Sequence, residues 1–430
     1  MRLNRLSEIK KNQDIYGDSA AISCGVFCPT FGVAVSAPLI KEAAVMVVGT
    51  AECTWYAKNS CLYHSEDPGY DRFYSCVFED SDITFGDRGG IKQSLLKIAE
   101  SEAIQCIFLV STCIPEIIGE DLEAISKEAQ KICGKPILPV HIAHYDNNCN
   151  EFGVAIARTL RVQGRLMKPQ TVKPGTVNFL GRNFHAGTAG TPKQSELAKC
   201  LEQAGVTINL MLPDQCCIKQ IYEAPGAALN IVTNEVGREL AEYMQNQFGT
   251  PFVEFEASLD INYISAGYQQ LEEYLELDLS ADYMALQQQA ESLVAEARQD
   301  LAGKTFINGG RPPDALEVAA FLSALGMKPM LINAYRLNDK SEANRQFILE
   351  QGCDPYVNYV ANPNAAMSML TKLQPDLYIG FGNGDYLRQL GISHLETLLP
   401  PGKIGYEAII HVITAIQAAL KGGDQDVSCA

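Results

Sequence analysis

The stretch Ile104-Gln105-Cys106-Ile107-Phe108-Leu109-Val110 is a short apolar run, and Ser111-Thr112-Cys113-Ile114-Pro115-Glu116 follows it directly. A run of this length with β-branched and aromatic residues is typical of a buried strand. The strand is expected to give way to a loop at Cys113.

Two more cysteines occupy similar positions. Cys53 closes Val48-Gly49-Thr50-Ala51-Glu52-Cys53, just after the apolar run Ala44–Val48, and Cys28 opens Cys28-Pro29-Thr30-Phe31-Gly32. Three thiolates delivered by three such loops are able to converge on one metal centre. We therefore treat Cys28, Cys53 and Cys113 as the candidate metal ligands.

Short β-branched runs alternate with amphipathic stretches along the rest of the chain. Strands that alternate with helices favour parallel sheets joined by right-handed crossovers. The sequence thus predicts an α/β protein with doubly wound, Rossmann-like, mainly parallel sheets. Further predicted strands are Ile137–Ile142, Val177–Leu180, Ile208–Leu212, Leu229–Val232, Thr305–Ile307, Pro329–Ile332 and Leu377–Phe381, and predicted helices include Ser195–Gln203, Glu235–Gln247, Leu316–Leu325 and Glu342–Glu350.

The chain is too long for one core, and two breaks divide it. Lys168-Pro169-Gln170-Thr171-Val172-Lys173-Pro174-Gly175 is polar and punctuated by prolines and glycine, as linkers are. A second break, Ala302-Gly303-Lys304, follows the long acidic helix predicted at Asp282–Asp300. We predict three α/β domains, 1–170, 171–302 and 303–430, with ligands bound in the clefts between them.

Composition limits which classes of partner the protein is expected to bind and in which compartment it is expected to reside. The 430 residues carry 51 acidic against 34 basic side chains, a net charge of −17, which argues against a nucleic-acid or anionic-membrane partner. Residues 1–19 are polar and lack the apolar region of a signal peptide, and no apolar run approaches the ~18 residues of a membrane span. We expect a cytoplasmic protein.

The 14 cysteines are expected to be reduced in that compartment, which favours metal or redox use over structural disulfides. Cys106, Cys133 and Cys200 lie in strand or helix patterns and are expected to be core residues. The pair Cys216-Cys217 and the isolated Cys353 and Cys429 match no metal spacing. The candidate ligands are 25 and 60 residues apart, without a compact pair, which excludes a zinc ribbon or ferredoxin motif and makes spacing alone a weak signal.

The residues around the three cysteines resemble the cluster-ligand signature of nitrogenase component 1 proteins. That family includes both subunits of the molybdenum–iron protein, the scaffold pair that builds its cofactor, and tetrapyrrole reductases. The resemblance rests on Cys28-Pro29-x-x-Gly32, Gly49-x-x-x-Cys53-x-x-Tyr56 and Ser111-Thr112-Cys113-x-x-Glu116-x-Ile118-Gly119-Glu120-Asp121-Leu122, and extends through Asp82–Gly86, Pro139–His141, Val177–Gly181, Pro375–Leu377 and Gly405–Glu407.

The resemblance implies an oxygen-sensitive iron–sulfur cluster between two related subunits, with Cys28, Cys53 and Cys113 as this chain's ligands. A [4Fe–4S] cluster would need a fourth ligand from the partner, whereas a P-cluster-like group would need three more cysteines. The partner is a second component 1 subunit, either a homologous chain or a second copy. The resemblance also implies an ATP-hydrolysing iron protein that docks over the junction and delivers electrons.

Two functions fit this picture. The chain is either an oxidoreductase subunit that passes electrons to a substrate or cofactor site, or a scaffold for assembly of a nitrogenase-type metallocofactor that performs no turnover. A metabolite enzyme of similar α/β build is the alternative outside the family. Catalytic residues and the substrate stay open at this stage.

Departures from the family pattern concern the molybdenum cofactor. In the cofactor-holding subunit a cysteine follows the strand that here reads Ala228–Val232, but this chain continues Thr233-Asn234. The family's cofactor histidine would fall near Leu398, and His394 is displaced by about one helical turn. No molybdenum-cofactor ligands are recognised in this chain, which favours a β-type or nitrogenase-like subunit.

Other motifs have ordinary interpretations that outweigh functional ones. His141-Ile142-Ala143-His144 could offer two imidazoles to a metal, but local hydrogen bonding is the more frequent role of such a pair. Gly380-Phe381-Gly382-Asn383-Gly384-Asp385 lacks the lysine of a phosphate loop and favours a tight turn. Trp55 is expected either to cover the cluster or an interface together with Tyr56, or to be a core residue. Three acids, Glu116, Glu120 and Asp121, are expected to face solvent or to begin a helix.

Overall fold

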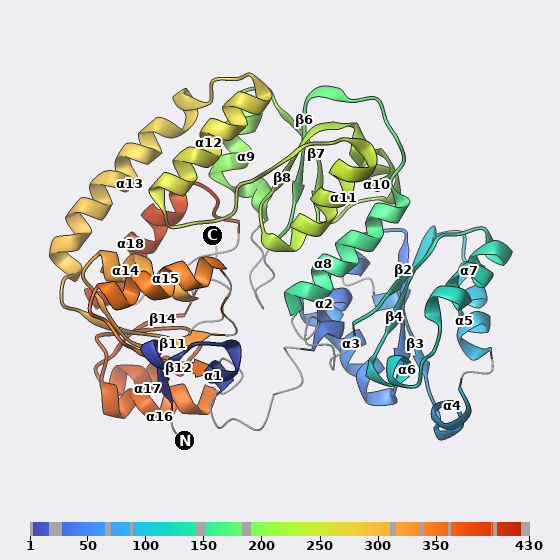
Figure 1. The fold of residues 1–430 in the computed structure, drawn as a ribbon, viewed down its shortest axis with the longest axis horizontal. Helices are drawn as coiled ribbons and strands as arrows, with labels where there is room; N and C mark the ends of the chain where they lie inside the picture. The colour runs from blue at the N-terminus through green and yellow to red at the C-terminus, as the bar shows by residue number, and fades with distance from the viewer. Residues whose placement is uncertain are drawn as a thin grey trace. The chain divides into compact units, whose positions relative to one another are not determined.

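The strands of the protein form three separate sheets in the computed structural model (Figure 1). All strand pairs in the described residues are parallel except one, in which β1 runs antiparallel to β12. This confirms the predicted α/β class with mainly parallel sheets. The structure describes residues 3–16, 28–64, 70–86, 89–142, 152–182, 191–309, 315–334, 337, 339–359, 363–396, 398 and 402–422.

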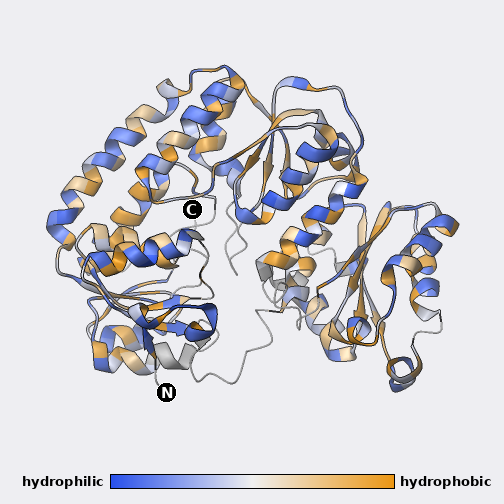
Figure 2. Cartoon of the chain, viewed as in Figure 1, coloured by the Kyte–Doolittle hydropathy of each residue, from blue (hydrophilic) through white to orange (hydrophobic). Residues whose placement is uncertain are grey.

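The first sheet has the strand order β3-β2-β4-β5. All seven residues of β2 are buried because successive side chains enter two different cores: Val45 and Val47 on one face, Met46 and Val48 on the other. Figure 2 shows the strands of this sheet as mainly hydrophobic. The elements are β2 (Ala43–Gly49), β3 (Phe73–Val77), β4 (Cys106–Ser111), β5 (Ile137–Val140), α2 (Pro29–Ser36), α3 (Ala51–His64), α4 (Asp80–Phe85), α5 (Gly90–Ala99), α6 (Cys113–Ile117), α7 (Leu122–Cys133) and α8 (Phe152–Gln163).

The second sheet repeats this topology, with the order β7-β6-β8-β9. Core side chains join it to the first sheet, since Leu180 and Val232 belong to the same buried cluster as Val45 and Phe108. The elements are β6 (Lys173–Leu180), β7 (Thr207–Leu212), β8 (Ala227–Val232), β9 (Phe252–Glu254), α9 (Glu196–Gln203), α10 (Ile218–Glu223), α11 (Arg238–Phe248) and α12 (Ile261–Leu275).

The third sheet has six strands in the order β1-β12-β11-β10-β13-β14. Its edge strand β1 comes from the extreme N-terminal part of the chain. The elements are β1 (Asn4–Arg5), β10 (Thr305–Asn308), β11 (Lys328–Ala334), β12 (Tyr356–Tyr359), β13 (Leu377–Ile379), β14 (Ser393–Leu395), α1 (Asn12–Tyr16), α13 (Ser280–Leu301), α14 (Ala315–Ala324), α15 (Asp339–Glu350), α16 (Pro363–Leu373), α17 (Gly384–Gln389) and α18 (Glu407–Leu420).

The chain divides into two compact units. One comprises Cys24–Glu256 with Gln270–Leu277 and holds the first two sheets, and the other comprises Met1–Ser23, Ala257–Gln269 and Asp278–Ala430. The break predicted near residue 170 therefore falls between two sheets of one unit, and the first residues of the chain belong to the third sheet. The division into domains 1–170, 171–302 and 303–430 stays a prediction, as does a ligand cleft between them.

Membrane insertion would need a long apolar helix, and the described part of the chain contains none that is both long and apolar enough to cross a membrane.

Candidate functional site

Two of the three candidate ligands lie where the first sheet reverses its strand order. The central strands β2 and β4 are hydrogen-bonded neighbours, and the chain leaves them in opposite directions to form the rest of the sheet. Cys53 follows β2 as the third residue of α3, and Cys113 follows β4 as the first residue of α6. The carboxyl ends of strands at such a switch point form the usual ligand crevice of doubly wound sheets. Cys53 is exposed and Cys113 is half-buried.

The third candidate ligand, Cys28, is the N-cap residue of α2. Its thiol is half-buried and donates a hydrogen bond to Thr30 Oγ1 at 3.3 Å. Helix α2 packs against α3, the helix that carries Cys53. Both Cys28 and Cys53 therefore lie at helix N-termini, where the positive end of the helix dipole stabilises an anionic sulfur.

The pKa of the Cys28 thiol responds to burial and to its neighbours. Burial raises the pKa of Cys28, hydrogen bonds with Thr30 oppose that rise, and the charges of Cys53 and Cys113 add to it. Such charge effects weaken with distance, so they act between groups of the same part of the first sheet. Thiolates are the usual ligands of iron–sulfur clusters, so three cysteines are a suitable donor set for one. Their role as cluster ligands stays a prediction.

A site for a single metal ion is a different matter. No group of three or more His, Cys, Asp or Glu side chains in the described residues is arranged to hold one ion. An iron–sulfur cluster does not require that arrangement, since it binds each thiolate to a different iron atom.

The absence of a side chain at Gly49 lets the ends of β2 and β4 pack closely. A Cβ atom at Gly49 would lie 2.0 Å from Oγ1 of Thr112, 2.9 Å from its Cγ2 and 3.0 Å from its Cβ. Thr112 N donates a hydrogen bond to Val48 O at 3.1 Å, while its buried Oγ1 has no hydrogen-bond partner among the described residues. The missing side chain at Gly49 thus allows the Cys113 turn to pack directly on the strand that leads to Cys53.

We expect Gly49→Ala to lower the free energy of unfolding by about 1–3 kcal/mol, because the Thr112 side chain occupies the space of the added methyl group. The measurement is urea denaturation of both proteins. Gly153→Ala is the matched control: its nearest neighbour, Val236 Cγ1, is 3.6 Å from the added Cβ, and alanine favours the helix there. Equal stability of the Gly49 and Gly153 variants would contradict this packing.

Glu116 connects the Cys113 turn to the strand β5. Ser111 Oγ and Ile142 N, the latter at 3.0 Å, both donate hydrogen bonds to Glu116 Oε1, and His141 Nδ1 lies 3.5 Å from the same oxygen. Burial alone would raise the pKa of Glu116, but the interactions with His141 and Ser111 outweigh burial and hold this pKa below its usual range. No sequence pattern indicated these contacts, which contradict a purely solvent-facing or helix-starting role for Glu116.

The contribution of the pair formed by Glu116 and His141 to the stability of the fold should depend on pH. Its interaction with Glu116 raises the pKa of His141; Glu123 acts in the same direction, while burial and Arg158 oppose it. A raised folded-state pKa stabilises the fold below the unfolded value of about 6.5, and that stability is lost as the pH rises through the folded pKa. Because the His141 side chain is 44% exposed, the expected contribution is at most about 1 kcal/mol.

Comparison of the native protein with His141→Gln measures this contribution. Melting temperatures of the two should differ at about pH 6 and converge at about pH 9. A difference that grows as the pH rises would show that the neutral ring, not the protonated one, supports the fold.

Two aromatic residues follow the exposed Cys53 on α3. Trp55 and Tyr56 are 59% and 56% exposed, with their rings edge to face at a centroid distance of 5.1 Å. The alternative that Trp55 is a core residue of this chain is therefore wrong. Phe85 on α4 and Ile117 on α6 are 70% and 62% exposed. We call Trp55, Tyr56, Phe85 and Ile117 the apolar rim.

The remaining cysteines whose burial the structure describes are all buried or half-buried. Cys106 and Cys200 are buried as predicted, although Cys106 begins its strand instead of lying in the middle. Burial raises the pKa of Cys106 to about 12, so its thiol stays protonated. Cys133 is half-buried at the end of α7. Cys216 is buried, Cys217 and Cys353 are half-buried, and Cys429 lies outside the described residues.

The other motifs have local structural roles. Asn383 caps α17 by accepting a hydrogen bond from Tyr386 N at 3.1 Å, and Gly380 O is 2.8 Å from His394 Nε2. Gly380 has a φ of 129°, as a tight turn requires. His144 lies outside the described residues, so the alternative of a metal site formed by His141 and His144 has no structural description.

The family resemblance would place cofactor ligands at two positions. The residues at these positions have structural roles instead. Asn234 accepts a hydrogen bond from Val236 N at 3.2 Å. Leu398 is only 5% exposed.

Comparison with known proteins identifies the family. A model of the nitrogenase component 1 type oxidoreductases matches residues 28–421, so the chain belongs to this family, as the sequence motifs predicted. A solved structure of nitrogenase Cp1 at pH 6.5 shares the fold, with a TM-score of 0.75 and 17% identity over 96% of each chain.

Two kinds of curated relatives are similar to this chain. A nitrogenase iron-molybdenum cofactor biosynthesis protein NifE from Methanococcus maripaludis is 24% identical over 364 residues, which cover 81% of this chain and 72% of that protein. One of the subunits of the light-independent protochlorophyllide reductase from Gloeobacter violaceus is 30% identical over 179 residues, 39% of this chain and 34% of that protein.

Proposed function

We propose that this chain is a nitrogenase-like component 1 subunit that holds an iron–sulfur cluster through Cys28, Cys53 and Cys113. The observation that supports the proposal is that Cys53 and Cys113 follow the two switch-point strands β2 and β4, while Cys28 caps α2, which packs against α3. A bound cluster supplies one-electron redox chemistry at potentials set by hydrogen bonds and solvent exclusion. The chain itself contributes the thiolates, the helix dipoles of α2 and α3, and the packing that keeps the cysteine turns in place.

A second chain is part of this proposal. Cys53 and the side chains of the apolar rim are exposed in the single chain, and exposed apolar side chains are frequent at subunit interfaces. We propose that a homologous chain or a second copy covers the rim and completes the ligand set of a [4Fe–4S] or P-cluster-like group. An ATP-hydrolysing iron protein is the proposed electron donor, and the cytoplasm the proposed compartment.

A scaffold function is the second candidate. The observation that favours it is coverage, because the NifE relative aligns with 81% of the chain, whereas the protochlorophyllide reductase relative aligns with 39%. A scaffold would hold a cofactor precursor without turnover. Incubation of the loaded protein with an iron protein and ATP separates the two: reduction of the cluster supports the oxidoreductase, and an unreduced cluster supports the scaffold.

The experiment that tests the cluster itself is metal analysis after anaerobic purification, alone and with the product of a neighbouring component 1 gene. We expect iron and acid-labile sulfide in similar amounts, with charge-transfer absorption that bleaches on reduction. Iron and sulfide near zero after reconstitution would refute the proposal for either function.

A further inference from the structure

The turn that carries Cys113 has little stability of its own. Helix α6 is five residues long and only Pro115 in it is buried, while Ile117 projects into solvent. A single helical turn is unstable in isolation because nucleation costs more entropy than its first hydrogen bond returns. Contacts from outside α6 must therefore fix the direction of the Cys113 thiol.

Glu116 supplies the contacts that reach farthest from the turn. One carboxylate oxygen accepts from Ser111 Oγ at the end of β4 and from Ile142 N, 3.0 Å away, just after β5. Ser111 Oγ also lies 3.3 Å from Val140 O, the last residue of β5. The side chain of Glu116 is 14% exposed, so these bonds are shielded from water.

The neighbouring acids lie against other parts of the unit. Asp121 caps α7 by accepting a hydrogen bond from Ala124 N at 2.9 Å, as expected for an acid that begins a helix. Glu120 Oε1 is next to Gly86, 3.1 Å from where a Cβ of that residue would lie. Glu116, by contrast, joins the end of β4 to the end of β5.

We propose that Glu116 is a positioning residue: its carboxylate braces the Cys113 turn against Ser111 and Ile142 so that the thiol faces Cys28 and Cys53. This inference rests on the proposed function, because it assigns Glu116 to the same cluster site. An oxygen acceptor is required at this place, since Ile142 N would otherwise lose this acceptor and Ser111 Oγ would keep only the longer bond to Val140 O at 3.3 Å.

The test measures the rate of alkylation of each cysteine in the metal-free, full-length protein by peptide mass spectrometry under anaerobic conditions. Glu116→Ala should raise the rate of Cys113 about tenfold relative to Cys53, because loss of the brace lets the turn open. Glu116→Gln should restore a rate within about twofold of the native protein, because the amide oxygen accepts from the same donors. Glu128→Gln, on the exposed side of α7, is the control that removes one charge nearby and should change neither cysteine.

Equal rates in the native and Glu116→Ala proteins would overturn the proposal, and so would a Glu116→Gln variant as fast as Glu116→Ala. If Glu116→Ala fails to fold, Ser111→Ala tests the proposal in its place. This substitution removes one of the two donors and should raise the alkylation rate of Cys113 selectively by about threefold. Equal acceleration of Cys28, Cys53 and Cys113 in Ser111→Ala would also overturn it.

Because no cluster is present in this assay, its outcome is separate from that of the metal analysis. If the native protein binds no iron, the proposed function is refuted even when the alkylation rates support the role of Glu116.

Discussion

Replacement of Cys113 by serine is expected to abolish most iron and sulfide binding by the anaerobically purified protein. A serine hydroxyl is a far weaker ligand than a thiolate, and the loss of one of three ligands from this chain leaves the cluster without support at the end of β4. Cys28→Ser and Cys53→Ser should have the same effect. The measurement is iron and sulfide content together with charge-transfer absorption.

Cys133→Ser provides the matched control. Cys133 is also half-buried, but it ends α7 and its Sγ lies 3.8 Å from Lys135 O. The same chemical change there should leave iron binding at the native level. A full cluster in Cys113→Ser would disprove this ligand assignment while leaving the family unaffected, and a loss in Cys133→Ser would indicate general instability.

The sequence predicted the central strands well because they are buried on both faces. Ala44–Val48 is an uninterrupted apolar run in a central strand, and the structure extends it by one residue at each end. Strands with mixed composition escaped detection. Phe73–Val77 alternates buried and exposed residues at the edge of its sheet, and its sequence, Phe-Tyr-Ser-Cys-Val, contains two polar positions. Short edge strands such as Phe252–Glu254 and Ser393–Leu395 have too few residues to show an apolar or alternating pattern.

The N-terminal edge strand could not have been predicted from any local pattern. Asn4 and Arg5 pair with Val357 and Tyr356, residues that follow them by more than three hundred positions. The contact is held by Asp354, whose carboxylate accepts hydrogen bonds from Ser7 N at 2.9 Å and Ser7 Oγ at 2.8 Å. A polar beginning with no apolar run is compatible with an edge strand because its backbone supplies the bonds.

The candidate cysteines could be selected from the sequence, but the contacts that support them could not. Positions just after apolar runs, together with the family resemblance of the surrounding residues, selected Cys28, Cys53 and Cys113 as candidates. By contrast, the packing of Thr112 on Gly49 depends on the register between β2 and β4, and the contacts of Glu116 depend on where β5 ends. Register is a property of two strands together, so neither segment alone encodes it.

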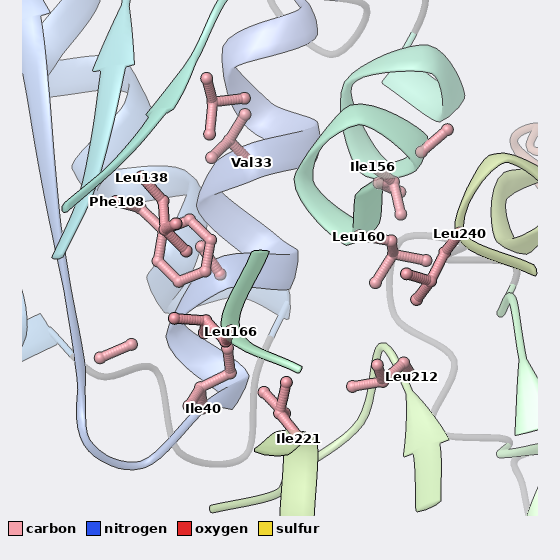
Figure 3. Close-up of a cluster of buried hydrophobic side chains, with 14 of the residues drawn as sticks. Val33, Ile40, Phe108, Leu138, Ile156, Leu160, Leu166, Leu212, Ile221 and Leu240 are labelled. Carbon is pink, nitrogen blue, oxygen red and sulfur yellow. The ribbon is translucent and has the colours of Figure 1, made fainter. Parts of the chain in front are cut away.

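Phe108→Ala is the substitution expected to destabilise the fold most. Phe108 is fully buried in β4, between Val45 of β2 and Leu138 of β5 in the sheet register. Figure 3 shows its ring beside Leu138, with Val33 and Leu166 among the surrounding side chains of the same core. Truncation of a buried phenylalanine costs about 3–5 kcal/mol, because the lost transfer free energy adds to the cost of the cavity.

This loss should be confined to the unit that holds the cysteines. Phe108 belongs to the compact unit of the first two sheets, whereas β10 and β13 belong to the other unit, so the two need not unfold together. Hydrogen exchange read by mass spectrometry should show faster exchange in β2 and β4 and native protection in β10 and β13.

Ile132→Ala, at a side chain that is 65% exposed on α7, is the control and should change neither set of strands. Equal loss of protection in both units of Phe108→Ala would mean that they unfold as one body. In that case the core beneath the Cys113 turn would stabilise the third sheet as well.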